Sequence, residues 1–386
     1  MASSKLPKTP RYLADAVTAD LAERMVFVGG PRQVGKTTFA LSLLENGGDE
    51  SSPAYLNWDY LADRETILAA RLPPRQPLLI FDEIHKYAAW RGLIKGLHDK
   101  HRSSVSFLVT GSARLDYYRK GGDSLQGRYH YYRLHPFTLM ESGRPRAADT
   151  VAHLLRFGGF PEPFLRGEER FHRRWLREHA ARVVHEDLRD LEQVREVSRL
   201  DLLLAHLPAC VGSPLSVNRL RILLQASHES VERWIAAFER LYLCYRLAPF
   251  GTPRIRAVRK EQKLYFWDWS RVADPGARFE NMVAGHLLKY CHLVEDTEGY
   301  AMELRFLRDT DGREIDFVVL RDGRPEFAVE CKSGGRRASP ACRYVRERSV
   351  IPRFYQVHLG SPDFGDADSD TRVLPFATFC TELALP

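Results

Sequence analysis

The stretch "GGPRQVGKTTFA", from Gly29 to Ala40, decides the fold of the first part of this chain. It contains the pattern G-x4-G-K-S/T, whose backbone N–H groups bind phosphate in many nucleotide-binding proteins. The apolar, β-prone run "RMVFVGG" leads into it, and "TTFALSLLE" continues with helical spacing. A strand, a glycine-rich loop and a helix in this order place N–H groups at a helix N-terminus, where the helix dipole favours an anion. The sequence therefore predicts an α/β domain that binds a nucleotide.

The loop also predicts individual ligands for ATP and Mg²⁺, the two expected cofactors. The Lys36 side chain is expected to reach the β- and γ-phosphates, and the Thr37 hydroxyl to ligate Mg²⁺. The other loop residues expected to bind the nucleotide are Gly30, Gln33, Val34, Gly35 and Thr38.

A second acidic element follows in "PLLIFDEIHK". Its apolar run reads as a fully buried parallel strand, and the carboxyl end of such a strand is where α/β sheets bind ligands. Asp82, at that end, is expected to hold the Mg²⁺ directly or through water. Glu83 is placed to polarise the attacking water, as a general base must. An ordinary acidic turn is the alternative.

Two further stretches complete the expected core. In "SVSFLVTGSAR" an apolar run ends at Thr110, and Thr110 and Ser112 flank a glycine. In three-strand phosphate-loop cores this position senses the γ-phosphate, so Thr110 is expected to take part in catalysis. In "SLQGRYHYYRLHPFTLMES", Arg128 stands between a short helix and a strand.

These four motifs in this order resemble the AAA-type ATPases of bacteria and archaea that carry an appended C-terminal domain of unknown function. In that superfamily the arginine before the last core strand often acts as a finger on the neighbouring subunit. The resemblance therefore implies that Arg128, with Arg114 as second choice, acts in catalysis, and it implies a homo-oligomer, with a hexamer favoured. An arginine that only forms a surface salt bridge is the alternative.

The composition favours a polyanionic partner. The chain has 386 residues and a net charge of +7, and Arg outnumbers Lys by 46 to 11 among its 57 basic residues. An arginine guanidinium can donate hydrogen bonds to two phosphate oxygens at once, so DNA is an expected partner. Codon bias would give the same excess of Arg over Lys. The six Cys have no zinc-like spacing, and no run of 18 apolar residues occurs. The expectation is a soluble, cytoplasmic protein without a membrane partner.

Residues 146–268 are expected to form a helical linker and a winged-helix-like domain. A "GGFPE" turn, also found in the resembling family, precedes a helix from about Glu168 to Leu188. Three helices follow, the second capped by Ser213 or Ser216 and the third by Ser227. Two strand-like runs then enclose a basic tip. The side chains expected to contact DNA phosphates are Arg254, Arg256, Arg259, Lys260 and Lys263. A protein-packing module is the alternative, since the third helix carries Glu229 and Glu232.

The last part, residues 269–386, has the motif order of a restriction-endonuclease-like, PD-(D/E)xK fold. Glu280 lies near the start of a helix, and "REIDFVVL" and "PEFAVECKSG" are two strands joined by the hairpin signal "RDGR". In that fold carboxylates hold Mg²⁺, the metal activates water, and a lysine orients the water or stabilises the developing charge. The residues of this nuclease-like site would be Glu280, Asp316, Glu330 and Lys332. The fold's proline-aspartate is Ile315-Asp316 here, and DNA binding without cleavage is the alternative.

The sequence thus predicts an AAA-type ATPase domain at residues 1–145, followed by the two regions above. The expected function is that of a Mg²⁺-dependent ATPase that binds or remodels DNA, in particular branched or broken DNA. An ATP-gated nuclease of repair or defence, and a nucleotide-controlled switch that binds a protein or an operator, are the alternatives.

Overall fold

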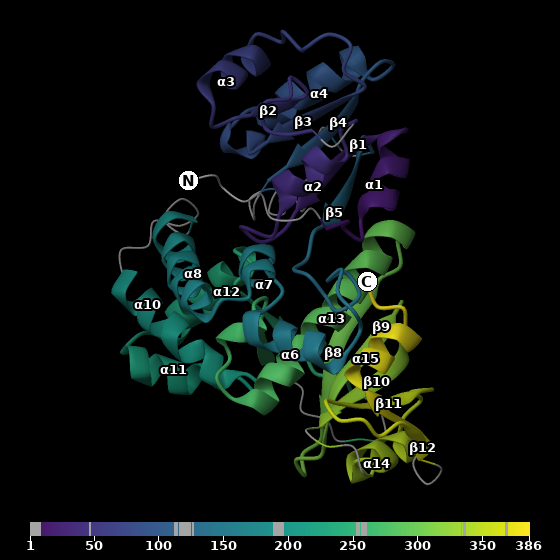
Figure 1. Ribbon diagram of the computed structural model, residues 1–386. Coiled ribbons are helices and arrows are strands. Elements are labelled where there is room, and N and C mark those ends of the chain that lie inside the picture. Colours follow the sequence, from purple (N-terminus) through teal and green to yellow (C-terminus); the bar gives the residue numbers. More distant parts are fainter. Residues whose placement is uncertain are drawn as a thin grey trace. The chain divides into compact units, whose positions relative to one another are not determined.

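The computed structural model describes residues 9–45, 48–111, 115, 125, 127–187, 197–251, 255, 261–332, 334, 337–366 and 370–386. It divides into two compact units, Met1–Pro136 and Phe137–Pro386, which are described separately (Figure 1). The division into three domains at residues 145 and 268 stays a prediction. Within the described ranges, no helix combines the length and the apolar character needed to cross a membrane.

The first unit is built on a parallel five-stranded sheet in the order β2-β3-β4-β1-β5. The strands are β1 (Met25–Gly29), β2 (Tyr55–Asn57), β3 (Leu78–Asp82), β4 (Ser106–Thr110) and β5 (Tyr129–Arg133). The helices are α1 (Ala14–Leu21), α2 (Lys36–Ser42), α3 (Leu61–Leu68), the 3₁₀ turn η1 (Ile84–Lys86) and α4 (Trp90–His101). Strands β1, β3 and β4 are buried almost throughout, as their unbroken apolar runs require. The α/β class and the phosphate-loop core predicted from the sequence are confirmed.

The strand order determines which residues meet. Strand β4 lies between β1 and β3, with Thr110 in register with Asp82 on one side and Val28 on the other. Parallel strands end at a common edge of the sheet, where ligands bind in open α/β folds. The phosphate loop, Asp82 and Thr110 therefore lie along the same edge.

The second unit begins with helices. They are α6 (Ala148–Phe157), α7 (Pro161–Arg166), α8 (Glu169–Arg182), the π-helical turn η3 (Val183–Asp187), α10 (Val197–His206), the 3₁₀ turn η4 (Leu207–Cys210), α11 (Val217–Leu224) and α12 (His228–Arg240). The long helix expected from about 168 is thus an α-helix that passes into a π-helical turn. Ser216, not Ser213, caps α11 by accepting the Arg219 N–H at 3.2 Å. Ser227 caps α12 as expected, accepting the Ser230 N–H at 3.0 Å.

An antiparallel hairpin follows the helices, formed by β6 (Cys244–Leu247) and β7 (Lys263–Phe266). All four residues of β7 are buried, and a bridge from Pro249 to Phe306 connects the segment after β6 to the next sheet. The elements agree with the outline of helices and ribbon read from the sequence. The winged-helix assignment itself stays a prediction.

The rest of the unit is a mixed six-stranded sheet in the order β12-β13-β11-β10-β9-β8. Its strands are β8 (Met302–Arg308), β9 (Glu314–Arg321), β10 (Arg324–Lys332), β11 (Phe354–His358), β12 (Phe364–Asp366) and β13 (Thr371–Pro375). The accompanying helices are η5 (Trp269–Arg271), α13 (Pro275–Glu298), α14 (Pro340–Arg348) and α15 (Phe376–Glu382). The tight turn from β9 to β10 has positive φ at Asp322 (50°) and Gly323 (74°), the conformation that the Asp-Gly hairpin signal predicts.

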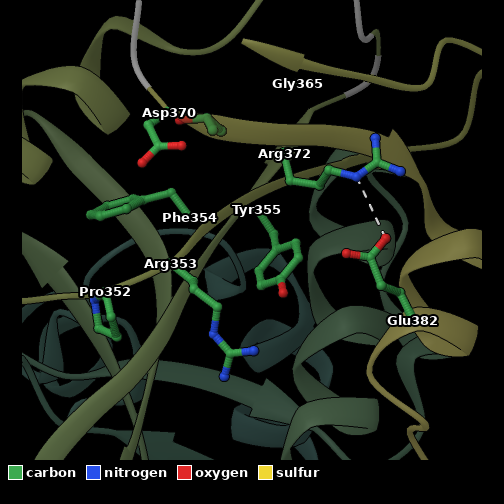
Figure 2. A pocket seen from close by; sticks show the side chains of 9 residues that line it. Pro352, Arg353, Phe354, Tyr355, Gly365, Asp370, Arg372 and Glu382 are labelled. Carbon is green, nitrogen blue, oxygen red and sulfur yellow. Dashed lines mark ion pairs between the residues drawn. The ribbon is translucent and has the colours of Figure 1, made fainter. Parts of the chain in front are cut away.

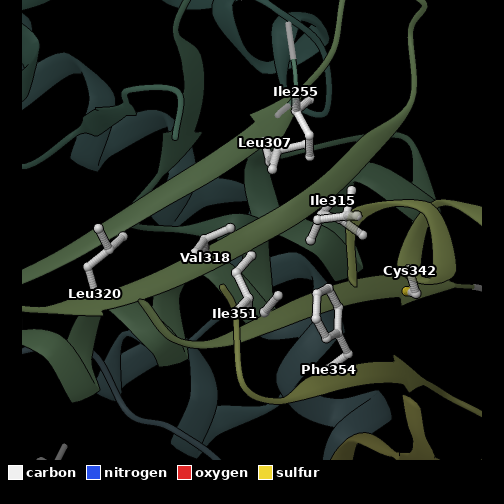
Figure 3. Close-up of a cluster of buried hydrophobic side chains, with 10 residues drawn as sticks. Ile255, Leu307, Ile315, Val318, Leu320, Cys342, Ile351 and Phe354 are labelled. Atoms are coloured by element: carbon white, nitrogen blue, oxygen red, sulfur yellow. The ribbon is translucent and has the colours of Figure 1, made fainter. Parts of the chain in front are cut away.

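One core of this unit lies between the sheet and α14 (Figure 3). Val318 and Leu320 of β9 pack there with Cys342 of α14, with Ile351 just before β11 and with Phe354, the first residue of β11. This packing holds β9 and β10 in place, and two acidic residues of the nuclease-like motif, Asp316 and Glu330, lie on these strands.

Candidate functional site

The phosphate loop has the backbone that its glycines predict. Gly30 has φ of 145°, and a Cβ there would lie 2.4 Å from the Leu134 carbonyl oxygen, so no larger residue fits without displacing the backbone. Gly35 has φ of 92° and directly precedes α2. Gln33 adopts the left-handed region at φ of 63° without being a glycine. Such conformations let successive N–H groups converge on one point, as an anion requires.

Two basic side chains, Lys36 and Arg11, donate hydrogen bonds to backbone carbonyl oxygens of the phosphate loop. Lys36 is buried, and its Nζ donates to the carbonyl oxygens of Gly30 at 3.1 Å and Pro31 at 2.7 Å. The Arg11 guanidinium donates to the Val34 carbonyl oxygen at 2.9 Å and to that of His135. Sequence analysis did not identify Arg11, because nothing near it forms a motif. Because the Lys36 ammonium is bound to carbonyl oxygens of the phosphate loop, its N–H donors stay close to the expected phosphate position.

Asp82 connects three elements of the sheet edge. Its Oδ2 accepts hydrogen bonds from the Thr37 hydroxyl at 2.8 Å and the Tyr55 hydroxyl at 2.7 Å. Its Oδ1 accepts the Thr110 hydroxyl at 2.5 Å. The structure thus brings together three residues that the sequence had assigned separately, Thr37, Asp82 and Thr110. A carboxylate and a neighbouring hydroxyl are oxygen ligands of the kind that Mg²⁺ prefers.

Tyr55 is a member of this site that sequence analysis missed. Burial, followed by the charge of Asp82, raises the pKa of its hydroxyl, so the group remains a donor. The same hydroxyl accepts the Asn57 side-chain amide at 3.3 Å. The only sequence signal is the short run "YLN", which carries no motif.

Glu83 differs from its neighbour in conformation and in environment. Its backbone lies in the left-handed region at φ of 57°, and its N–H donates to the Thr110 carbonyl oxygen at 3.0 Å. Burial is the largest influence on its carboxylate and raises the pKa, against the opposing charges of Lys86 and Lys36. Lys86 Nζ lies 3.3 Å from the Glu83 carboxylate. A strained backbone and a raised carboxyl pKa are features that cluster at functional sites.

These residues fit a nucleotide with Mg²⁺. The Gln33 side-chain oxygen is buried and lacks a hydrogen-bond partner among the described residues, at the point where the loop turns. Lys36 supplies the cation, and Thr37 and Asp82 supply oxygen ligands.

Arg128 lies at the other end of the sheet. It precedes β5, whose register with β1 pairs Tyr129 with Met25 and Arg133 with Gly29. The five residues of β5 separate it from the level of the loop by roughly 16 Å at 3.3 Å per residue. Its Nε donates to Asp99 at 3.0 Å, and 37% of its side chain is exposed. Arg114, the second choice, lies outside the described residues, as does Ser112.

Of the five residues of the β6–β7 hairpin that the sequence predicts to contact DNA, only Lys263 is described by the structure. Arg254, Arg256, Arg259 and Lys260 lie outside the described residues. Lys263 is described, and the prediction for it is wrong. Its side chain is completely buried and its ammonium forms ion pairs with Glu280, Glu314 and Asp316, so it cannot contact a DNA backbone. The sequence predicted that Lys263 belongs to an exposed tip, whereas Lys263 is the first residue of the buried strand β7.

The nuclease-like residues of the second unit differ in burial: Asp316 and Glu330 are buried, Glu280 is partly buried and Lys332 is exposed. Glu280 of α13 and Asp316 of β9 both reach Lys263, at 3.0 Å and 3.6 Å from its Nζ. Asp316 also accepts the Cys331 N–H at 2.8 Å. Burial, then the charges of Glu280 and Glu330, raises the pKa of Asp316.

Glu330 and Lys332 lie next to each other on β10, as strand periodicity predicts. The Glu330 carboxylate is buried and its Oε1 lies 2.5 Å from the Lys332 ammonium. Burial raises the pKa of Glu330, against the opposing charge of Lys332. Within the described ranges, no three or more His, Cys, Asp or Glu side chains form a group that could hold a metal ion.

A cavity of about 430 Å³ opens beside strands β11 and β13 (Figure 2). It is lined by Pro352, Arg353, Phe354, Tyr355, Gly365, Asp370, Thr371, Arg372 and Glu382. Arg372 pairs with Asp363 and lies 3.5 Å from Glu382, so acidic side chains already balance its charge. None of the residues predicted from the sequence lines this cavity.

Comparisons with known proteins divide the chain into three matched segments. Residues 22–142 match a family described as an AAA domain. Residues 148–273 and 275–379 match two families, each described as a domain of unknown function (DUF8612 and DUF4143). The AAA family supports ATPase activity and implies nucleotide binding.

The individual proteins that the chain resembles share little sequence identity with it. The uncharacterized protein MJ1544 of Methanocaldococcus jannaschii is 22% identical over 343 residues, which cover 80% of this chain and 75% of that protein. The RuvB Holliday junction branch migration motor of Thermotoga maritima is 18% identical, with a TM-score of 0.32, over 62% of this chain and 87% of that one. A variant of the same RuvB gives 16% identity and a TM-score of 0.35, over 64% and 93%. TM-scores this low support no functional inference.

The segment that matches the AAA domain contains the phosphate loop, Asp82, Glu83, Thr110 and Arg128. The chain is therefore an N-terminal AAA domain of the P-loop ATPase type followed by two domains of unknown function.

Proposed function

We propose that this protein is a Mg²⁺-dependent ATPase that works on DNA as a homo-oligomer. The observation that carries the ATPase part is the set of hydrogen bonds at Asp82, which joins the helix of the phosphate loop through Thr37 to the end of β4 through Thr110. An arrangement of this kind links the ligand of the metal to a group that can sense the γ-phosphate.

Each residue has a role that its geometry allows. Lys36 exchanges the loop carbonyls for β- and γ-phosphate oxygens, and Thr37 and Asp82 hold the metal. Bound Mg²⁺ neutralises the charge that develops on the phosphates. Glu83 accepts hydrogen bonds from the attacking water and orients it, and its raised pKa brings it closer to the range suited to a base.

The position of Arg128 supports the proposed oligomer. The separation of roughly 16 Å along β5 exceeds the reach of an arginine side chain toward the phosphate loop of its own chain. In this chain the guanidinium pairs with Asp99, and as a finger it would serve the nucleotide site of a second copy. This is the arrangement of an arginine finger supplied in trans.

The DNA part of the proposal rests on charge. The chain carries a net charge of +7, and the tip between β6 and β7 contains four basic residues (Arg254, Arg256, Arg259 and Lys260) against Glu261. On α8, Arg173 forms an ion pair with Glu169, and Arg174 and Arg182 form ion pairs with Glu178, so these three arginines are partly compensated. The net positive charge of the tip sequence favours an interaction with phosphates.

DNA binding through the tip is tested by its salt dependence. Replacing Arg254, Arg256 and Arg259 with Ala should flatten the slope of log affinity against log salt by up to about three units on duplex DNA, since each lost contact changes it by about 0.9. The loss should be similar for all sequences, because these contacts position the DNA and do not read bases. Fluorescence anisotropy over a salt series measures the slope, and Lys100→Ala, which removes an exposed side chain of α4, is the control. An unchanged slope would remove the tip from the DNA interface.

Tyr55 gives a prediction for the nucleotide site. Tyr55→Phe removes one of the two hydroxyls on Asp82 Oδ2 and leaves the ring in place. We expect the Mg²⁺ concentration for half-maximal ATP turnover to change severalfold, with less effect on ATP binding without metal, because the carboxylate loses a neutral donor that fixes its orientation. A Mg²⁺ titration of the steady-state rate measures this. If Mg²⁺ dependence is unchanged, the hydroxyl has only a packing role.

A further inference from the structure

The second unit contains a charged side chain in an unexpected place. Lys263, the first residue of β7, has no exposed side-chain surface. A lysine this buried needs partners, because moving an ammonium out of water costs free energy unless opposite charges and hydrogen bonds replace the solvent.

The partners come from two different elements. The Lys263 Nζ lies 3.0 Å from Glu280 Oε1 of α13, forms a close ion pair with Glu314, and lies 3.6 Å from Asp316 Oδ1. The Tyr265 hydroxyl donates to the same Glu280 oxygen at 2.7 Å. Three carboxylates thus surround a group with three N–H donors.

Glu314 was not identified from the sequence, although a signal exists. It precedes Asp316 by two residues on β9, and side chains two apart on a strand point to the same face. The carboxylates around the ammonium are therefore those of Glu280, Glu314 and Asp316. With Glu330, whose charge acts on Asp316, they form the carboxylate cluster: Glu280, Glu314, Asp316 and Glu330.

Charge in the carboxylate cluster is close to balanced without any metal. Lys263 is joined by Lys332, which pairs with Glu330, and by Arg308, whose Nη1 lies 2.8 Å from Glu314 Oε2. Burial alone would lower the pKa of Lys263, but the charges of Glu280, Asp316 and Glu314 outweigh it and raise that pKa, so the ammonium stays charged. Three cations then face four carboxyl groups.

We propose that Lys263 is the resident cation of the carboxylate cluster, so that its ammonium takes the place between Glu280 and Asp316 where a nuclease of this motif would hold a divalent metal. An ammonium meets oxygen atoms at hydrogen-bond distance, whereas Mg²⁺ requires six oxygens at about 2.1 Å. The ammonium lies 3.0 Å from Glu280 Oε1, so this oxygen already has a cationic partner. Without a metal to activate water, the cluster does not hydrolyse phosphodiesters.

The inference is independent of the proposed ATPase and is tested with Mn²⁺ alone. Mn²⁺ binding to the full chain is measured by electron paramagnetic resonance without nucleotide, so that any weak binding at Asp82 is common to all variants. Lys263→Met keeps the apolar stem and removes the charge. It should gain one Mn²⁺ site per chain relative to wild type. Adding Asp316→Asn to Lys263→Met should abolish the gain.

Lys289→Met is the matched control. Lys289 is equally buried, and its ammonium pairs with Glu141 at 2.6 Å, away from the carboxylate cluster. It should gain no site. A Mn²⁺ site that appears equally in Lys289→Met would show that loss of any buried ammonium has this effect, and would overturn the proposal.

Two other results would also overturn it. One is a folded Lys263→Met variant that gains no Mn²⁺ site. The other is a wild-type protein whose Mn²⁺ binding, or Mn²⁺-dependent nicking of DNA, is lost in Asp316→Asn. Should Lys263→Met fail to fold, this second comparison decides alone, because equal Mn²⁺ binding by wild type and Asp316→Asn is the result that the proposal requires.

Discussion

Lys36→Ala is expected to reduce ATP turnover to the background of the assay. The β- and γ-phosphates lose their cation, and the loop loses the two hydrogen bonds that the ammonium donates to Gly30 and Pro31. Charge-assisted bonds of this kind contribute about 1.5–3 kcal/mol each, so the variant should also be somewhat less stable. Steady-state hydrolysis and thermal unfolding separate the two effects, with Lys100→Ala as the control.

Glu83→Gln should give a different result in the same assay. It leaves the loop and Asp82 intact and removes only the group that orients water, so ATP binds but persists unhydrolysed. Because burial raises the pKa of Glu83, the wild-type rate should fall on the acid side at a higher pH than for an ordinary glutamate, as the base becomes protonated. A Glu83→Gln variant that hydrolyses ATP at the wild-type rate would mean that the base is another residue.

Arg128→Ala is expected to lower ATP turnover by about 10³-fold or more, the scale of an arginine finger, with ATP affinity nearly unchanged. The exposed ion pair with Asp99 supplies the matched control. Asp99→Ala removes the same ion pair and keeps the guanidinium, so its rate should stay near wild type. Equal losses in the two variants would mean that the ion pair, and not the finger, matters.

Mixing variants tests whether Arg128 acts between subunits. A mixed oligomer of Arg128→Ala and Lys36→Ala contains some sites with an intact loop and an intact finger, so part of the activity should return. No recovery at any mixing ratio, with both variants folded, would argue against action in trans.

The fold of the first unit could be predicted because its signals are local. The loop has a fixed spacing, and the apolar runs that end at Asp82 and Thr110 are strands whose carboxyl ends must share one edge of a parallel sheet. Their convergence follows from those rules. Tyr55 could not be predicted, because β2 has only three residues and its place beside β3 depends on pairing between distant parts of the chain.

In the second unit, the charge pattern of the sequence did not predict which basic side chain is buried. Lys263 belongs to a basic run in the sequence, and a run of charges usually marks a solvated face. Its burial depends on partners in α13 and β9, which lie far along the chain. The choice between Ser213 and Ser216 likewise needed the backbone, since both can begin a helix and only Ser216 accepts the required N–H.

The central claim, an ATPase that acts on DNA, is tested most directly by one measurement. The steady-state ATPase rate is recorded with Mg²⁺ and with duplex, single-stranded or four-way-junction DNA, while light scattering gives the particle mass. The account predicts an oligomer whose rate rises severalfold or more with at least one of these DNAs, and no such rise in Arg128→Ala. An ATPase rate that none of the three DNAs changes would contradict the account and favour a nucleotide-controlled switch.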